Sequence, residues 1–167
     1  GLAYQWHYTN SGNNAFDKTN STGETLAGSI AGCDVGCYEA WQKCTGDPSV
    51  IVAVLDDGVM YTHPDLAGNI WVNDKEELYA GTDADGNGYK DDRYGYNFVH
   101  NTAAISWTDV SDIGHGTHVS GTIAAMNNGY GVCGIAGGDG TKDSGVKIMI
   151  CQVFAGENSV SLNGEAQ

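Results

Sequence analysis

The stretch SVIVAVLDDGV at residues 49–59 decides the expected fold, because an unbroken run of β-branched and aliphatic residues ends there in two aspartates and a glycine. A second run of this kind, VKIMICQVF, occupies residues 146–154. Such runs are typical of strands buried on both faces of a parallel sheet. Between them, HGTHVSGTIAAMNN (115–128) has the pattern of a helix that ends at a glycine turn. The order of strand, long connection, helix and strand predicts an α/β fold with a mostly parallel central sheet.

The remaining segments are expected to be poor in regular structure. Residues 1–38 are polar and rich in Gly, Ser, Thr and Asn, which is typical of an extended N-terminal segment. Residues 38–46 predict a short helix with a glycine stop, and residues 95–100 a third, weaker strand. Two or three parallel strands make a small sheet, and only a polar tail follows residue 154. We therefore expect residues 1–167 to be the N-terminal portion of a single domain whose C-terminal portion is absent from this chain.

Charge and composition restrict the classes of partner. The chain has 21 acidic against 7 basic residues, a net charge of −14. Binding to nucleic acid depends on Lys and Arg that neutralise phosphates, so we expect no nucleic-acid partner. The acidity suits cation binding or the solubility of a secreted protein. No apolar run reaches the length of a transmembrane helix, so we expect no membrane span.

The five cysteines leave several interpretations open. An odd number leaves at least one thiol free within the chain. A disulfide among the first three is expected only if the protein is exported, and a zinc site there lacks a fourth nearby ligand. The last two lie in apolar runs and are expected to be small buried side chains. The cysteines are Cys33, Cys37, Cys44, Cys133 and Cys151.

Asp56 is the first candidate for chemistry, because it stands at the carboxyl end of the first strand. Functional groups in open parallel sheets lie just past these ends. The alternative is an aspartate that only stabilises a turn through backbone amides. Its neighbour Asp57 is expected to point to the opposite side, so that only one of the two faces a site.

His115 and His118, in the stretch GHGTHVSG (114–121), are the second candidates. Residues three apart share a helix face, so a metal pair is geometrically allowed. Zinc needs three or four ligands, however, and no H-E-x-x-H pattern is present. A histidine held at one ring nitrogen by a carboxylate is a general base at the other. The alternative for either residue is a structural histidine, and for His118 this is the interpretation we favour.

The segment DADGNGYKDD (83–92) predicts a calcium site on its own chemistry. Oxygen-bearing side chains alternate at its start and are followed by a glycine and a residue that offers a carbonyl, as in the first two-thirds of an EF-hand loop. Tyr94 stands where the closing glutamate would be, so the loop is not an EF-hand. The alternative is a solvated acidic turn. The candidate ligands are Asp83, Asp85, Asn87, Tyr89, Asp91 and Asp92.

These motifs together resemble the subtilisin-like serine proteases. VAVLDDGV (52–59), HPDL (63–66), GHGTHVSGTIAA (114–125) and NNGYGVCGIAG (127–137) follow in the order and spacing of that family. The resemblance implies a three-layer, subtilisin-like α/β fold, with Asp56 as the triad aspartate and His115 as the triad histidine.

The resemblance further implies a serine endopeptidase that acts on extended polypeptides. The family's nucleophile lies in a G-T-S-M-A-type motif, which this chain does not contain. We therefore expect residues 1–167 alone to be inactive, with the serine supplied by a C-terminal half or a second chain. The alternative is a pseudo-protease or a calcium-binding interaction module. Secretion, or an extracytoplasmic location, is the expectation that goes with the family.

The family also implies a calcium site of its own, beside the loop that follows the histidine helix. Mapped onto this sequence, the ligands are three side chains and three backbone carbonyls. The side chains are those of Gln5, Asp65 and Asn128, and the carbonyls are those of Met126, Tyr130 and Val132. The alternative is a helix-ending turn without metal. The acidic segment 69–98 is longer than in the simplest family members, and a bound ion would order it.

Overall fold

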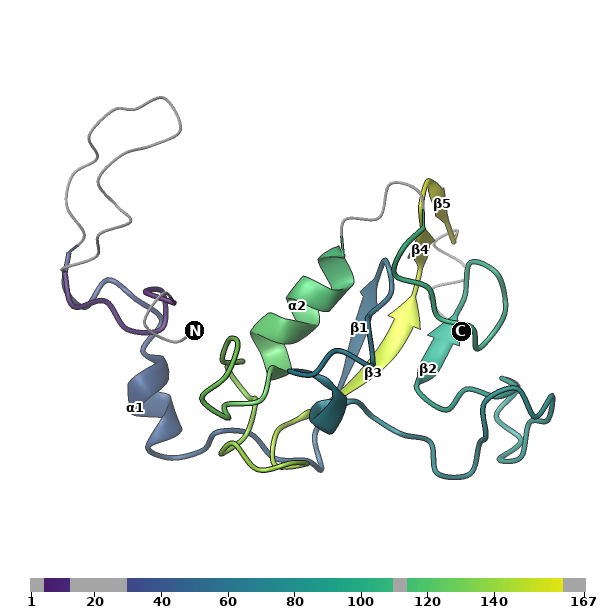
Figure 1. Ribbon diagram of the computed structural model, residues 1–167, viewed down its shortest axis with the longest axis horizontal. Coiled ribbons are helices and arrows are strands. Elements are labelled where there is room, and N and C mark those ends of the chain that lie inside the picture. The colour runs from purple at the N-terminus through teal and green to yellow at the C-terminus, as the bar shows by residue number, and fades with distance from the viewer. Residues whose placement is uncertain (1–4, 13–29, 110–113, 161–167) are drawn as a thin grey trace.

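The computed structural model describes residues 5–12, 30–109 and 114–160 (Figure 1). Each predicted helix and strand is present and shorter than expected, because the ends of the apolar runs turn into loop. The helices and strands are α1 (Cys37–Trp41), β1 (Ile51–Asp56), the 3-10 helix η3 (Ala67–Asn69), β2 (Gly95–Asn97), α2 (His115–Ala124), β3 (Lys147–Gln152), β4 (Phe154–Ala155) and β5 (Asn158–Ser159). Part of the predicted extended segment 1–38 lies outside the described residues.

The central sheet is parallel, as predicted, with the strand order β1-β3-β2. Ile51 pairs with Lys147 at one end and Asp56 with Gln152 at the other. The crossover from β1 to β3 therefore brings the carboxyl ends of all three strands to one edge of the sheet. β4 and β5 form a separate antiparallel pair just beyond β3.

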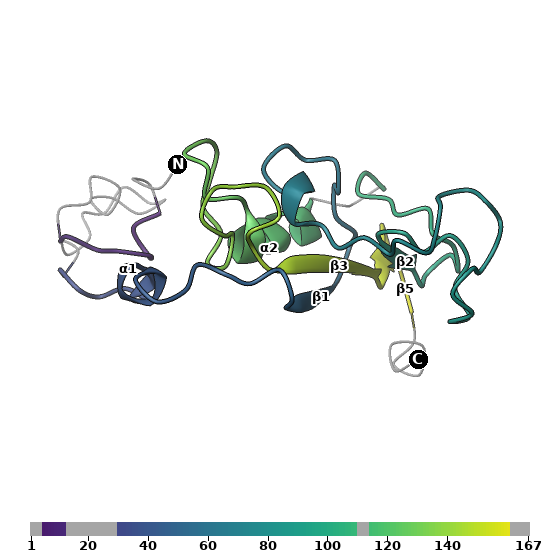
Figure 2. The same cartoon turned by 90° about the horizontal axis from the view of Figure 1, so that it is seen from below.

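The prediction that β1 and β3 are buried on both faces is wrong for the described chain. Helix α2 packs on one face of the sheet, and the opposite face of β1 and β3 carries no helix among the described residues (Figure 2). Ile51 and Leu55 on that face are each 50% exposed, whereas Ile148 and Ile150 on the other face are fully buried. An apolar run cannot distinguish a covered face from an uncovered one, because the covering layer is supplied by other segments.

The core lies between α2 and the sheet. Its members are aliphatic side chains, and burying each contributes roughly 1.5–3 kcal/mol relative to exposure. The buried residues of this core are Val54, Val59, Leu66, Ile70, Ala124, Val146, Ile148 and Ile150, with Val119 and Ile123 of α2 packed against them. This packing fixes α2 against one face of β1 and β3.

A buried amide ties the end of α2 to the loops around it. Asn69 is fully buried, and its Nδ2 donates to the carbonyls of Ala124 (2.9 Å) and Gly137 (3.1 Å). Its Oδ1 accepts from the amide of Gly145 at 3.3 Å. One side chain thus satisfies backbone groups at three positions that lie 55, 68 and 76 residues away from it in sequence.

All five cysteines are free thiols in the structure. The prediction of small buried side chains is only partly met, because Cys133 and Cys151 are half-buried. Among the described residues, no helix has both the length and the apolar character to span a bilayer.

Candidate active site and metal sites

Asp56 and His115 meet at the carboxyl end of the sheet. Asp56 is the last residue of β1 and His115 the first of α2, and both carboxylate oxygens of Asp56 lie 2.8 Å from Nδ1 of His115. The aspartate is largely covered, with 15% of its side chain exposed, whereas 61% of the histidine side chain is exposed. The carboxylate is therefore held by the protein while the far side of the imidazole faces solvent.

This contact determines which nitrogen of His115 is free. A carboxylate only accepts hydrogen bonds, so Nδ1 must carry the proton that it donates to Asp56. Nε2 is then the lone-pair nitrogen on the exposed side of the ring. The hydrogen bond and the negative charge of Asp56 raise the pKa of His115 above its ordinary value, with a smaller contribution from the charge of Asp57. The arrangement is that of a general base oriented by a carboxylate.

Asp57 does not behave as expected. Instead of pointing away from the site, its buried carboxylate contacts the first turn of α2, where it accepts from the amides of His115 (3.1 Å) and Gly116 (2.6 Å). Side chains alternate in direction only within a strand, and β1 ends at Asp56. The chain then turns at Gly58 (φ +95°), so the alternation does not predict the direction of the Asp57 side chain. Both aspartates therefore serve the same histidine, one through the ring and one through the backbone.

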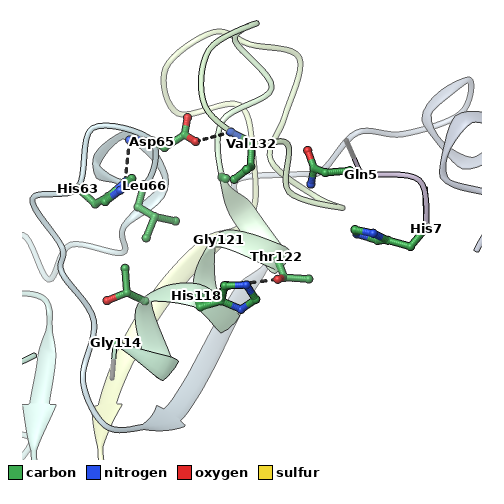
Figure 3. A pocket seen from close by; sticks show the side chains of 12 residues that line it. Gln5, His7, His63, Asp65, Leu66, Gly114, His118, Gly121, Thr122 and Val132 are labelled. Carbon is green, nitrogen blue, oxygen red and sulfur yellow. Dashed lines mark hydrogen bonds between the residues drawn. The ribbon is translucent and has the colours of Figure 1, made fainter. Parts of the chain in front are cut away.

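His118 lies apart from this pair. It is exposed and lines a cavity of about 450 Å³ between α2, the N-terminal segment and the HPDL stretch (Figure 3). His7 and His63 line the same cavity, and Nδ1 of His63 accepts from the amide of Asp65 at 3.2 Å. The one group of three metal-ligating side chains found among the described residues contains no histidine. The geometry thus separates the two histidines of the GHGTHVSG stretch.

Asp65, expected to be a ligand of the first calcium site, contacts two other members of the predicted set, Met126 and Val132, through their backbone amides. This side chain is 5% exposed; its Oδ2 accepts from the amide of Val132 at 2.9 Å, and its Oδ1 is buried without a hydrogen-bond partner among the described residues (Figure 3). The amide of Met126 donates to the carbonyl of Asp65 at 2.9 Å. A Cβ at Gly131 would lie 2.2 Å from Oδ2, so the loop passes against the carboxylate as only glycine allows.

Two further members of that set are already engaged in hydrogen bonds. The side chain of Gln5 forms a two-bond bridge to the backbone of Cys133, with both distances 2.8 Å. Oδ1 of Asn128 accepts from the amide of Tyr130 at 2.9 Å. Gln5 and Asp65 thus contact neighbouring residues of the same loop, Cys133 and Val132. The buried Oδ1 of Asp65 without a partner is an oxygen of the kind that Ca²⁺ binds.

The second predicted site is a compact acidic loop at the far side of β2. Oxygens of Glu76, Asp83 and Asp85 lie within 4.8 Å of one another. Nδ2 of Asn73 donates to Asp85 (2.9 Å) and to Asp92 (3.0 Å). Of the predicted ligands, Asp83 and Asp85 thus lie in the cluster, and Asp92 is joined to Asp85 through Asn73.

The other predicted members of this loop hold its backbone. Oδ1 of Asn87 accepts from the amide of Tyr89 at 2.8 Å, and Nδ2 of Asn87 donates to Asp92 at 2.8 Å. Oδ1 of Asp91 accepts from the amide of Gly81 at 2.7 Å, and the carboxylate of Asp91 is not one of the three grouped carboxylates. Burial raises the pKa of Asp92 and the nearby charges of Asp85 and Glu76 add to the shift, whereas hydrogen bonds from Asn87 and Asn73 oppose it.

Glu76 is the residue that the sequence reasoning missed. It is fully buried, and its carboxylate accepts from the amides of Ala84 (2.5 Å), Asp85 (3.1 Å) and Asp91 (3.2 Å). It lies seven residues before Asp83, outside the alternating pattern that drew attention to the loop. The stretch NDKEELY (73–79) does indicate a possible extension of the acidic loop, because it places acidic residues beside an asparagine. Nothing in it distinguishes the buried Glu76 from the exposed Glu77.

Comparison with known proteins agrees with this architecture. An aspartate that orients a histidine through Nδ1 is the arrangement of these two residues in an Asp-His-Ser triad. A sequence model of the Subtilase family of peptidases (Peptidase_S8) matches residues 47–165. The chain belongs to the subtilase family, and its fold is the α/β fold of subtilisin, present in part.

Individual relatives are proteases much longer than this chain. Subtilisin-like protease 1 of Plasmodium vivax is 46% identical over 106 residues, which are 62% of this chain and 15% of that protein. An Aeromonas sobria protein named an extracellular serine protease is 33% identical over 132 residues, 79% of this chain and 16% of the relative.

A solved structure of the Aeromonas sobria serine protease with a chaperone superposes with a TM-score of 0.64 at 28% identity, covering 99% of this chain and 21% of that one. The chain thus spans about a sixth to a fifth of the length of these proteins. These relatives are all described as serine proteases or subtilisin-like proteases.

Proposed function

We propose that this chain supplies the Asp56 and His115 members of the triad of a serine endopeptidase, and that a C-terminal half or a second chain supplies the serine. The observation that supports this is the 2.8 Å contact between Nδ1 of His115 and the carboxylate of Asp56. It fixes the tautomer in which Nε2 is free to accept a proton. Because the chain contains no nucleophile motif, residues 1–167 alone hydrolyse no peptide bond.

In the proposed mechanism, Nε2 of His115 accepts the proton of the serine hydroxyl as the oxygen attacks a peptide carbonyl. The same nitrogen then donates this proton to the leaving amine. Asp56 keeps the ring in place and stabilises the imidazolium that forms between the two steps. The substrate is a polypeptide, as for the relatives, and its sequence preference depends on walls that this chain does not provide.

We also propose that calcium stabilises the protein at two places. At the first, Asp65 and Gln5 contribute side-chain oxygens; Asn128 and the carbonyls of Met126, Tyr130 and Val132 complete the set. At the second, the cluster of Glu76, Asp83 and Asp85 forms the centre, with Asn87, Asp92 and the carbonyl of Tyr89 near it and Asp91 at its margin. The buried, unpartnered Oδ1 of Asp65 supports the first site, and the close carboxylates support the second. The ion would supply positive charge that offsets carboxylate repulsion.

Secretion or another extracytoplasmic location is part of the proposal. Its supports are the name of the Aeromonas sobria relative and the net charge of −14, which suits solubility outside the cell.

The test uses the complete protein with a polypeptide substrate. We expect His115→Ala to lower kcat by several powers of ten while the melting temperature stays near that of the wild type. His118→Ala is the matched control on the same helix and should keep most of the activity. A wild-type protein that is folded and inactive would favour a pseudo-protease. Loss of activity in a stable His118→Ala variant would overturn the assignment of the two histidines.

A further inference from the structure

Helix α2 begins without a cap of its own. Its N-cap residue is Gly114, in the left-handed conformation (φ 70°), and no side chain of the N-cap satisfies the first turn. The first backbone amides of a helix have no partner within the helix and carry partial positive charge. An acceptor must therefore come from elsewhere, or these amides remain solvated beside the site.

Asp57 provides this acceptor from the end of β1. Its two oxygens are divided between the first two amides of α2, with Oδ2 on His115 and Oδ1 on Gly116. Only 8% of Asp57 is exposed. A buried carboxylate needs compensation, and two charge-assisted hydrogen bonds at the positive end of a helix supply it.

The contact is close enough to fix the helix in position. A Cβ at Gly116 would lie 2.3 Å from the carbonyl oxygen of Gly58 and 2.9 Å from Oδ1 of Asp57. At the next residue of the same turn, Oγ1 of Thr117 accepts from the amide of Met60 at 3.0 Å. The first turn of α2 is thus fastened to the residues that follow β1 at several successive points.

Two adjacent residues therefore hold the two parts of one histidine. The Asp56 carboxylate contacts the ring of His115, and the Asp57 carboxylate contacts its backbone amide. We propose that Asp57 is a positioning residue for His115, fixing the backbone from which the imidazole projects toward a nucleophile. This inference deepens the proposed protease function and rests on it. It assigns Asp57 no contact with substrate.

The test compares Asp57→Asn and Asp57→Ala in the complete protein, with Asp47→Asn as control. Asp47 is an exposed aspartate that caps a turn through Ser49, far from the site. We expect Asp57→Ala to lower kcat about 10- to 100-fold with KM changed less than about twofold, because misplacing a catalytic group slows the chemical step rather than binding. Asp57→Asn should lose less, since its Oδ1 still accepts from one amide.

A second readout needs no turnover. Among the described residues, the charges that act on His115 are those of Asp56 and Asp57, and the charge of Asp57 raises its pKa. In both variants the NMR titration of the His115 imidazole in the complete protein should therefore shift to lower pH, and Asp47→Asn should leave it in place. If the wild type hydrolyses no peptide, the protease proposal fails while this titration still decides the role of Asp57.

Several outcomes would overturn the inference. An unchanged kcat in folded Asp57→Ala shows that His115 needs no such anchor. A loss of kcat with an unchanged His115 titration shows that Asp57 acts in some other way. Failure of both variants to fold assigns Asp57 to folding rather than to placement of the histidine.

Discussion

At the scale of single residues, the protonation of His115 is governed by Asp56. The carboxylate favours the imidazolium by hydrogen bond and by charge, and so raises the pKa of His115 above 6.5. A general base works only when neutral, so in the complete enzyme the activity should rise with pH through a value above 6.5. The interaction that orients the proposed base would thus move its working pH range upward.

Asp56→Asn tests this relation directly. The substitution removes the charge and leaves an amide of the same shape, so the pKa of His115 should fall toward its ordinary value. In an NMR titration of the complete protein, the His115 midpoint should move to lower pH, while Asp139→Asn, at an exposed turn, should leave it unchanged. A midpoint that stays in place would show that Asp56 does not control the ring. In the same variant kcat should fall by orders of magnitude, because the amide can hold the wrong tautomer.

At the scale of elements, buried polar side chains hold the loops around α2. Asn69 donates to the carbonyls of Ala124 and Gly137 from a fully buried position. These two bonds connect the end of the helix to the loop that leads into β3. The position of α2, and with it that of His115, depends on this connection as well as on apolar packing.

Asn69→Asp should therefore destabilise the protein severely for so small a change. A carboxylate cannot donate, so two buried carbonyls lose their partner and face a negative charge. Each unsatisfied buried group costs about 1–3 kcal/mol, so we expect the free energy of unfolding to fall by about 3 kcal/mol or more. Denaturant unfolding of the complete protein measures this. Asn158→Asp, at an exposed position, is the control, and equal effects of the two substitutions would contradict the role given to Asn69.

The elements also show what local sequence pattern can predict. The apolar runs of β1 and β3 are long and unbroken, and α2 is bounded by glycines, so the existence and order of these elements follow from the sequence. The exposed face of the sheet and the direction of the Asp57 side chain do not follow from the sequence, because both depend on which segments pack nearby. The contact between Asp56 and His115 could be predicted because each residue lies in a local motif. Glu76 joins the acidic cluster only when residues 73–92 fold around it.

At the scale of the whole molecule, the main physical problem is negative charge. The net charge is −14, and the loop around Glu76 concentrates several carboxylates in a segment that contributes only the short strand β2 to the sheet. Hydrogen bonds from backbone amides and from Asn73 compensate part of this charge. Bound cations are the natural remaining compensation, and they would stabilise the native state alone, because the unfolded chain does not assemble the cluster.

Calcium should accordingly raise the melting temperature of the complete protein, and EDTA should lower it. An ion present at 100 times its Kd adds about 2.7 kcal/mol to the free energy of unfolding. Asp65→Asn and Asp85→Asn should each remove part of the calcium-dependent increment, one for each proposed site, and Asp139→Asn should remove none. The increment is the quantity to compare, since these substitutions also change stability without calcium. A melting temperature that responds neither to calcium nor to EDTA would reject both sites. If one variant keeps the full calcium-dependent increment, the site that contains the substituted residue would be rejected, because losing a ligand should weaken calcium binding there.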